Sequence, residues 1–132
     1  LYGNGLRRQM IHDVCKKIMK KQSIFFGSGK ETRDFIHIDD FTDLIKKIII
    51  KSFKNFLVIN AGCGKGIKVI DVINYIGKKL KKNIQPKFNM FGSNVNPVSL
   101  VANISKTKKF NWYPKIDFYK GLEEYINWLS ND

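Results

Sequence analysis

The spacing of apolar residues along the chain predicts four amphipathic helices. They span residues 8–21, a segment that begins after Asp39 or Asp40, residues 69–81 and residues 118–129. In each segment apolar residues recur at intervals of three and four, which is the spacing of one buried stripe on an α-helix. The four stripes are Ile11, Val14, Cys15 and Ile18; Phe41, Leu44, Ile45, Ile48 and Ile49; Ile73, Ile76 and Leu80; and Leu122, Tyr125, Ile126 and Leu129.

Short apolar runs between these helices predict strands. We expect residues 24–26 and 33–38 to pair as a hairpin around Gly27-Ser28-Gly29, because glycines favour tight turns. Asp39 or Asp40 would then cap the next helix. Residues 56–59 form a continuous apolar run typical of a buried strand, and residues 85–89 indicate another strand.

The remaining segments complete a mixed fold. Residues 91–97 suggest an irregular polar loop, and a short helix after Ser105 should be stopped by Pro114. Strands alternate with helices but a hairpin is also expected, so the fold class is mixed α/β (α+β). A length of 132 residues fits a single domain with its own core.

Composition indicates a soluble, cytoplasmic chain. Apolar residues make up 43% of the sequence without an uninterrupted run of about 18, so no membrane span is expected. Cys15 and Cys63 form no metal-binding or disulfide pattern, and Cys15 is expected in the core. The first residue is leucine and the first residues look like the end of a strand, so we expect a part of a longer protein.

The net charge of +13 leaves a basic nucleic-acid-binding module as one alternative. Most lysines, however, fall on polar faces and C-terminal turns of the expected helices, where cations favour the helix dipole and solubility. Charge is also the alternative's sole support, since no aromatic and basic interleaving accompanies it. We therefore expect nucleic acid to be an unlikely partner.

Arginine is scarce: Arg7, Arg8 and Arg33 stand against 21 lysines. A chain rich in lysine should keep arginine where a planar, permanently charged donor is needed. Arg33 follows the glycine turn, at the mouth of the expected hairpin. That position suits a side chain that grips a phosphate.

Four ordered motifs resemble the C-terminal, substrate-binding part of the extended short-chain dehydrogenase/reductase family, which includes the NAD-dependent nucleotide-sugar epimerases and dehydratases. They are Leu1-Tyr2-Gly3; Gly27-x-Gly29-x-x-x-Arg33-Asp34-Phe35-x-His37-x-Asp39-Asp40; Asn60-x-Gly62; and Ala102-Asn103-Ile104-Ser105-Lys106 followed by Asn111-Trp112-x-Pro114. The resemblance covers essentially the whole chain. It implies a small substrate-binding domain without its Rossmann cofactor domain.

The resemblance also implies roles for individual residues. Arg33 matches the ligand of the pyrophosphate in a nucleotide-diphosphate sugar, although it could instead tie the hairpin to Asp39 or Asp40. Other matched positions contact the base, sugar or nucleotide, and Tyr2 matches a position near the cofactor. These substrate-binding positions are Ile24, Phe26, Asn60, Gln9, Met10 and Arg8. NAD or NADP would be held mainly by the chain's own N-terminal Rossmann domain, and none is expected on these residues.

The sequence departs from the family pattern in several places. An Arg-Pro-Gly-Asp segment is usual where this chain has Ser93-Asn94-Val95-Asn96, and Lys87 could supply the missing charge. Asn103 replaces a usual aspartate, and His12 replaces a common proline. The glycine-rich dinucleotide fingerprint does not occur. The chain alone is therefore expected to catalyse no turnover.

Two further patterns suggest other chemistry. Tyr75-x-x-x-Lys79 has the spacing of the family's catalytic pair, but any two residues four apart share one helix face, so we interpret it as a surface feature. Residues 58–66 resemble the first motif of an S-adenosylmethionine-dependent methyltransferase, in which a strand leads into a glycine loop. The acidic residues that such a site needs do not follow, which makes this alternative less favoured.

Overall fold

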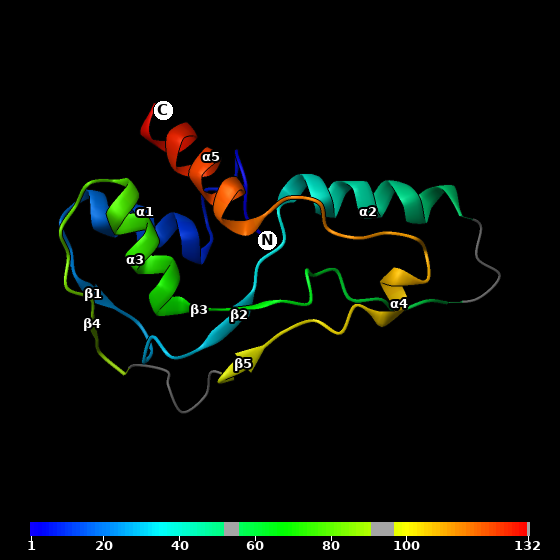
Figure 1. Ribbon diagram of the computed structural model, residues 1–132, viewed down its shortest axis with the longest axis horizontal. Coiled ribbons are helices and arrows are strands. Elements are labelled where there is room, and N and C mark those ends of the chain that lie inside the picture. Colours follow the sequence, from blue (N-terminus) through cyan, green and yellow to red (C-terminus); the bar gives the residue numbers. More distant parts are fainter. Residues whose placement is uncertain (52–55, 91–96, 132) are drawn as a thin grey trace.

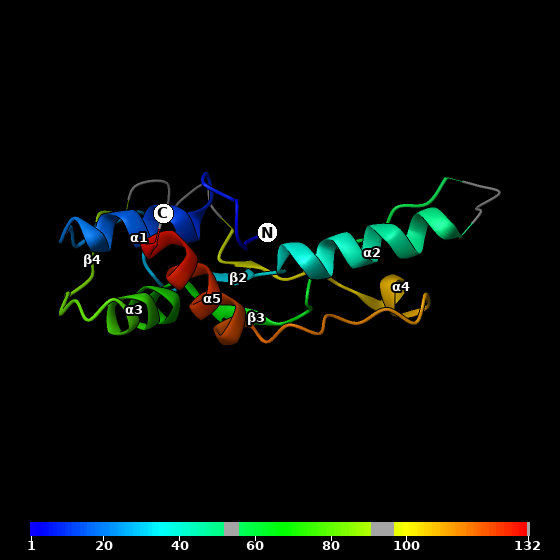
Figure 2. The ribbon, with the colours of Figure 1, turned by 90° about the horizontal axis from the view of Figure 1, so that it is seen from above.

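The computed structural model describes residues 1–51, 56–90 and 97–131. The described helices are α1 (Met10–Met19), α2 (Ile38–Ile50), α3 (Val69–Lys79), α4 (Ser105–Lys108) and α5 (Phe118–Ser130). The described strands are β1 (Ile24–Phe25), β2 (Thr32–Asp34), β3 (Gly66–Lys68), β4 (Lys87–Phe88) and β5 (Ser99–Leu100). This mixture confirms the predicted fold class. Figures 1 and 2 show α2 extending away from the group formed by α1, α3 and α5.

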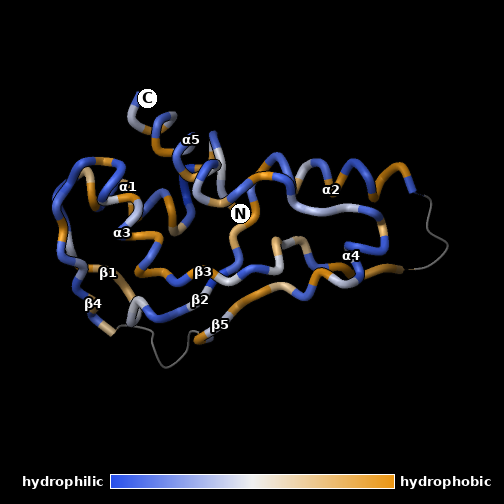
Figure 3. Tube along the Cα trace, in the orientation of Figure 1, coloured by the Kyte–Doolittle hydropathy of each residue, from blue (hydrophilic) through white to orange (hydrophobic). Residues whose placement is uncertain are grey.

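Two hydrophobic cores correspond to these two parts of the molecule. The larger lies among α1, α3 and α5, where Cys15, Ile73 and Leu122 are fully buried. The smaller packs Ile36 and Leu44 against Trp112. Figure 3 shows apolar and polar stretches alternating along the helices, as their one-sided burial requires. The predicted stripes of the first, third and last helices are thereby confirmed, with Leu80 half-buried at the edge of the larger core.

The predicted hairpin is wrong. β1 pairs in parallel with β4, whereas β2 lies between antiparallel β3 and parallel β5. The turn between β1 and β2 is organised by the Glu31 carboxylate, which accepts hydrogen bonds from the Ser28 N–H and hydroxyl at 2.7 and 3.0 Å. Gly29 has a φ of +77° and packs against the Phe88 ring, leaving no room for a Cβ. The turn therefore directs the two strands to different sheets.

Helix α2 differs from its prediction in its N-cap and in its buried face. His37, not Asp39 or Asp40, is its N-cap, and the His37 Nδ1 accepts a hydrogen bond from the Asp39 N–H at 3.2 Å. Ile45 and Ile49 were expected to face inward, but they are 38% and 75% exposed. The side of α2 that they occupy contacts neither described core.

Two other predictions of secondary structure are wrong. Residues 56–59 form no strand, and Phe56 is 94% exposed. Helix α4 ends at Lys108, well before Pro114, and Asn111 has a positive φ of 52°. Residues 85–89 do contain a strand, but it is limited to Lys87 and Phe88.

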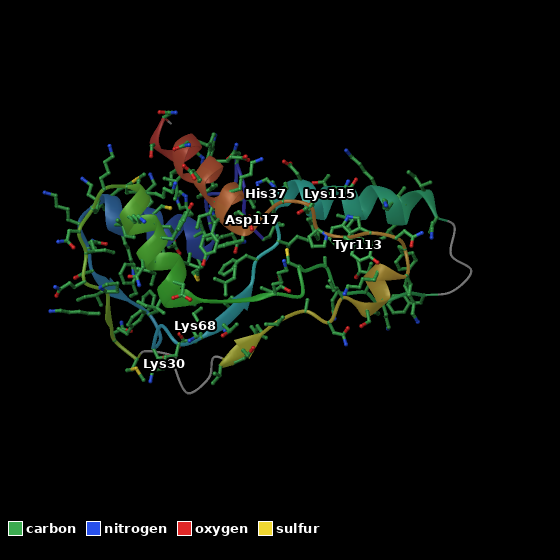
Figure 4. All side chains as sticks on the ribbon, in the orientation of Figure 1. Lys30, His37, Lys68, Tyr113, Lys115 and Asp117 are labelled. Atoms are coloured by element: carbon green, nitrogen blue, oxygen red, sulfur yellow. The ribbon has the colours of Figure 1, made fainter. Side chains whose placement is uncertain are left out.

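Two carboxylates, the half-buried Asp34 and the buried Asp40, join the segments by binding backbone N–H groups. Asp34 accepts hydrogen bonds from Cys63, Gly64 and Ala102 at 2.8, 2.8 and 3.1 Å. Asp40, in the first turn of α2, accepts from the backbone of Lys115 and Ile116 at 3.0 Å. Figure 4 labels His37, Lys115 and Asp117 where the segment before α5 passes the start of α2. These contacts fix segments that are far apart in the sequence.

We expect Asp40→Ala to lower the free energy of unfolding by about 3 kcal/mol, because it strands buried N–H groups that now bind a carboxylate. The neighbouring Asp39 is 76% exposed, so Asp39→Ala should change stability by less than about 0.5 kcal/mol. Chemical denaturation of both variants measures the difference. Equal losses would contradict a role for Asp40 in joining α2 to the segment before α5.

Candidate functional site

A cavity of about 610 Å³ lies between α1, β1, β2 and the start of α3. Its wall combines apolar and aromatic side chains with a few charged ones, as small-molecule sites commonly do. Met10, Val14 and Phe25 form part of the apolar wall, and Val69 and Ile73 close it from α3. The cavity is thus built against the larger core, whose packing fixes the elements around it.

Arg33 lines this cavity from β2 and is half-buried. Its Nη1 donates hydrogen bonds to the carbonyl oxygens of Thr32 and Pro97, both at 2.9 Å. Among the described residues no carboxylate forms an ion pair with it, so the alternative in which Arg33 ties to Asp39 or Asp40 is wrong. The guanidinium has five N–H donors, and the two carbonyls hold it in place while donors remain for an anion.

The acids beside Arg33 are already bound by other groups. Glu31 and Asp34 line the same cavity, but the Glu31 carboxylate binds Ser28 and the Asp34 carboxylate binds three backbone N–H groups. Lys16, Lys17 and Lys20 line the opposite wall from α1, together with Asp13. The lining therefore carries four cationic side chains against three acids, two of which already accept hydrogen bonds within the protein, and this excess of positive charge favours an anionic ligand.

The structure brings four of the predicted site residues together. Gln9, Met10, Phe26 and Arg33 all line the cavity. Gln9 is the N-cap of α1 and makes no side-chain capping bond, and Gln9, Met10 and Ile11 place the first turn of this helix at the cavity wall. Phe26 is 64% exposed there. These placements agree with the predicted base and phosphate contacts without testing them.

The other predicted residues lie elsewhere. Arg8 and Ile24 are exposed outside the cavity lining, and the Asn60 amide donates to the Asn103 carbonyl at 3.1 Å. Tyr2 is only 2% exposed, and its hydroxyl donates to the Phe118 carbonyl at 3.3 Å. Within the described chain, Tyr2 therefore packs in the core.

Two of the sequence departures now have structural explanations. The His12 Nδ1 lies 3.0 Å from the Tyr125 hydroxyl, which links α1 to α5 at a place where proline could form no such bond. Asn103 Oδ1 accepts a hydrogen bond from the Ser105 N–H at 3.0 Å, as an aspartate there could also do. Residues 93–96 lie outside the described residues. Lys87 is exposed on β4 and does not line the cavity.

Tyr75 and Lys79 take part in packing between α3 and α5. The Lys79 ammonium forms an ion pair with Glu123 at 2.7 Å and lies 5.5 Å from the Tyr75 ring centroid. Neither side chain lines the cavity. Their position fits the interpretation of this pair as a surface feature.

The methyltransferase alternative is not supported by the geometry. No strand precedes the glycine loop in the described residues, and the N–H groups of Cys63 and Gly64 bind the Asp34 carboxylate. A cofactor loop needs such N–H groups for its ligand. The Cys63 thiol is also unsuited to act as a nucleophile, because burial, with a further contribution from Asp34, raises its pKa to about 11.

Sequence reasoning missed Lys17, Glu31 and Asp34 as contributors to the cavity. Lys17 was assigned to the polar, C-terminal part of its helix, and only the fold brings it beside β1. Asp34 is part of the recognised motif, but its partners lie 29 to 68 residues away. Across the described residues, no cluster of His, Cys, Asp and Glu could hold a metal ion. The described helices are all too short or too polar to cross a membrane.

Comparison with known proteins supports the resemblance. The model of the NAD dependent epimerase/dehydratase family matches residues 1–62. The chain is 34% identical to a UDP-glucuronate 4-epimerase from Thermodesulfobacterium geofontis over 138 residues, which cover all of this chain and 41% of that protein. It is 28% identical to a CDP-abequose synthase from Salmonella typhimurium, covering 98% of this chain and 46% of that protein.

Comparison of the fold with solved structures agrees with the comparison of sequences. A UDP-glucuronic acid 4-epimerase from Bacillus cereus, solved with UDP-4-deoxy-4-fluoro-glucuronic acid and NAD, superposes with a TM-score of 0.86 at 25% identity, covering 98% of this chain and 42% of that one. The fold is thus that of the extended short-chain dehydrogenase/reductase epimerases over about two fifths of their length. Together these matches support a relationship between this chain and the NAD-dependent epimerase/dehydratase family.

The titration of Glu31 provides a test of the turn beside the cavity. Burial acts to raise the pKa of this carboxyl, but hydrogen bonds from Ser28, together with the backbone N–H groups of Glu31 and Gly29, outweigh it and hold the pKa below its usual value. A pKa that is lower in the folded than in the unfolded chain stabilises the fold above about pH 4.3, and the stabilisation is lost as pH falls through the folded value.

Glu31→Gln keeps an acceptor oxygen but removes its charge. We expect it to lower the free energy of unfolding by about 1 kcal/mol at pH 7, with the deficit shrinking as pH falls below about 4. Urea denaturation across this pH range measures the change, and Glu124→Gln on the exposed face of α5 is the matched control. A deficit that is constant with pH would show that the charge of Glu31 contributes nothing to the turn.

Proposed function

We propose that this chain is the C-terminal, substrate-binding part of an NAD(P)-dependent nucleotide-sugar epimerase, dehydratase or reductase. The observation that carries the proposal is the half-buried Arg33 in a cavity whose neighbouring acids are bound to other groups. An arginine held by backbone carbonyls, with donors to spare, suits a diphosphate. Proteins similar to this chain include a UDP-glucuronate 4-epimerase, a CDP-abequose synthase and a putative GDP-L-fucose synthase from Arabidopsis thaliana.

The cavity can receive each part of such a ligand. The diphosphate would lie beside Arg33, and the free N–H groups at the start of α1 would also favour its negative charge. The base would lie against Phe26, next to the apolar wall. Gln9 and Met10 would contact the nucleotide from the start of α1. Held in this way, the sugar would be presented to a reacting group outside the chain.

The proposal places the dinucleotide cofactor mainly outside this chain. The loop at Gly62–Gly64 directs its N–H groups to Asp34, and Tyr2 is buried. NAD or NADP, which supplies hydride chemistry when bound, would therefore be held by an N-terminal Rossmann domain. The exposed apolar side chains of Ile49, Ile50 and Phe56 offer a surface that such a domain could cover.

Arg33→Ala in the intact protein should weaken binding of UDP-glucuronic acid at least 10-fold, because a charge-assisted phosphate contact contributes about 1.5–3 kcal/mol. Calorimetric titration measures the affinity, and the thermal unfolding midpoint shows whether the variant still folds. Arg8→Ala removes the same charge outside the cavity and should have a smaller effect. Undiminished affinity in folded Arg33→Ala would contradict the proposed function.

A further inference from the structure

A second cavity, of about 420 Å³, lies at the C-terminal end of α3 and shares no lining residue with the first. Three lysines line it, Lys78, Lys81 and Lys82, together with the side chains of Asn74 and Asn83. Among the described residues, no Asp or Glu belongs to its lining. This cavity is therefore more one-sided in charge than the first, which contains three acids beside its cations.

The geometry of the main chain accounts for this cavity. Gly77 has no side chain, and a Cβ there would lie 3.2 Å from Ile84, which covers the helix at this point. The chain turns back through a hydrogen bond from the Lys82 N–H to the Gly77 carbonyl at 3.0 Å. A second bond runs from the Lys81 N–H to the Lys78 carbonyl at 3.1 Å. These carbonyl groups at the end of α3 are satisfied by the main chain, so they need no lysine ammonium.

The ammonium groups around this cavity form no hydrogen bond or ion pair within the described part of the chain. Other lysines do: Lys47 donates to the Asn111 carbonyl at 2.8 Å, and Lys79 pairs with Glu123 at 2.7 Å. Lys82 is also half-buried, so its charge is partly removed from water without an acid to compensate for it. An anion bound in the cavity would supply that compensation.

We propose that this second cavity binds a small phosphate-bearing molecule, with Lys78, Lys81 and Lys82 as its cationic ligands. A phosphate monoester carries about −1.5 to −2 charges at pH 7, which suits several cations better than a single carboxylate does. Lysine binds phosphate as a point charge, and the amides of Asn74 and Asn83 can donate further hydrogen bonds. The inference is independent of the proposed function, because the two cavities have separate linings.

Lys81 allows ligand binding to be measured separately from stability. Its φ of 53° lies in the left-handed region, at the position after the C-cap of α3, where glycine is usual because it has no Cβ. Lys21 has a φ of 57° at the equivalent position after α1 and lines neither cavity. Replacing either lysine by glycine relieves the same backbone strain and removes one exposed ammonium. The two variants therefore form a matched pair.

The test is a calorimetric titration of the intact protein with pyrophosphate at about 0.15 M salt, which screens scattered surface charges. Saturating NAD is present so that pyrophosphate cannot occupy a cofactor site, and every protein carries Arg33→Ala to weaken binding in the first cavity. Lys82→Gln removes the half-buried ammonium. Lys108→Gln removes an exposed ammonium that lines neither cavity and is a second control.

We expect Lys82→Gln to weaken pyrophosphate binding about 10-fold. Lys81→Gly should weaken it about 5-fold while raising the midpoint of thermal unfolding, because the strain at this position is relieved. Lys21→Gly should raise the midpoint similarly but, like Lys108→Gln, should change the affinity less than about 2-fold. Weaker binding by a more stable protein could not be due to partial unfolding.

Equal losses of affinity in Lys81→Gly and Lys21→Gly, or in Lys82→Gln and Lys108→Gln, would show a general effect of charge and overturn the inference. The absence of pyrophosphate binding before these substitutions would also overturn it. A short single-stranded oligonucleotide is titrated in parallel. If it binds more tightly than pyrophosphate and depends equally on Lys21 and Lys81, the surface binds an extended polyanion, and the assignment to a small molecule is wrong.

Discussion

The binding of three backbone N–H groups by the Asp34 carboxylate is the interaction on which the arrangement of the cavity depends. It holds Cys63 and Gly64, which precede β3, and Ala102, which follows β5. These two strands are the neighbours of β2 in the three-stranded sheet. Because Arg33 is the adjacent residue of the same strand, fixing Asp34 also fixes the backbone from which the guanidinium extends.

The two hydrophobic cores stabilise different parts of the structure. The larger one packs α1, α3 and α5 together, and the cavity is built on its surface from α1, β1, β2 and the start of α3. The smaller core joins α2 to Trp112, whose indole donates to Asp43 at 3.0 Å. The side of α2 that carries Ile45 and Ile49 contacts neither core. The ligand cavity and the exposed apolar surface therefore occupy different parts of the molecule.

The helices could be predicted from the sequence because amphipathic spacing is a local signal, and α1, α3 and α5 follow it closely. The pairing of the strands could not, because they are two or three residues long and their partners are distant: Ile24 pairs with Lys87, and Thr32 with Ser99. In the site, the motif resemblance identified Arg33 and Phe26. Lys17 escaped notice because lysines recur throughout this chain, and only the contact between α1 and β1 sets this one apart.

Recognition of the main chain by Asp34 has a consequence for substitutions. The carboxylate binds N–H groups, which every residue except proline possesses, so it places little demand on the side chains at positions 63 and 102. A change of side chain at position 63 or 102 leaves the N–H that Asp34 binds in place, even though the Cys63 thiol also donates to the Phe35 carbonyl at 3.1 Å. Loss of the Asp34 carboxylate would instead leave three N–H groups without their acceptor at once.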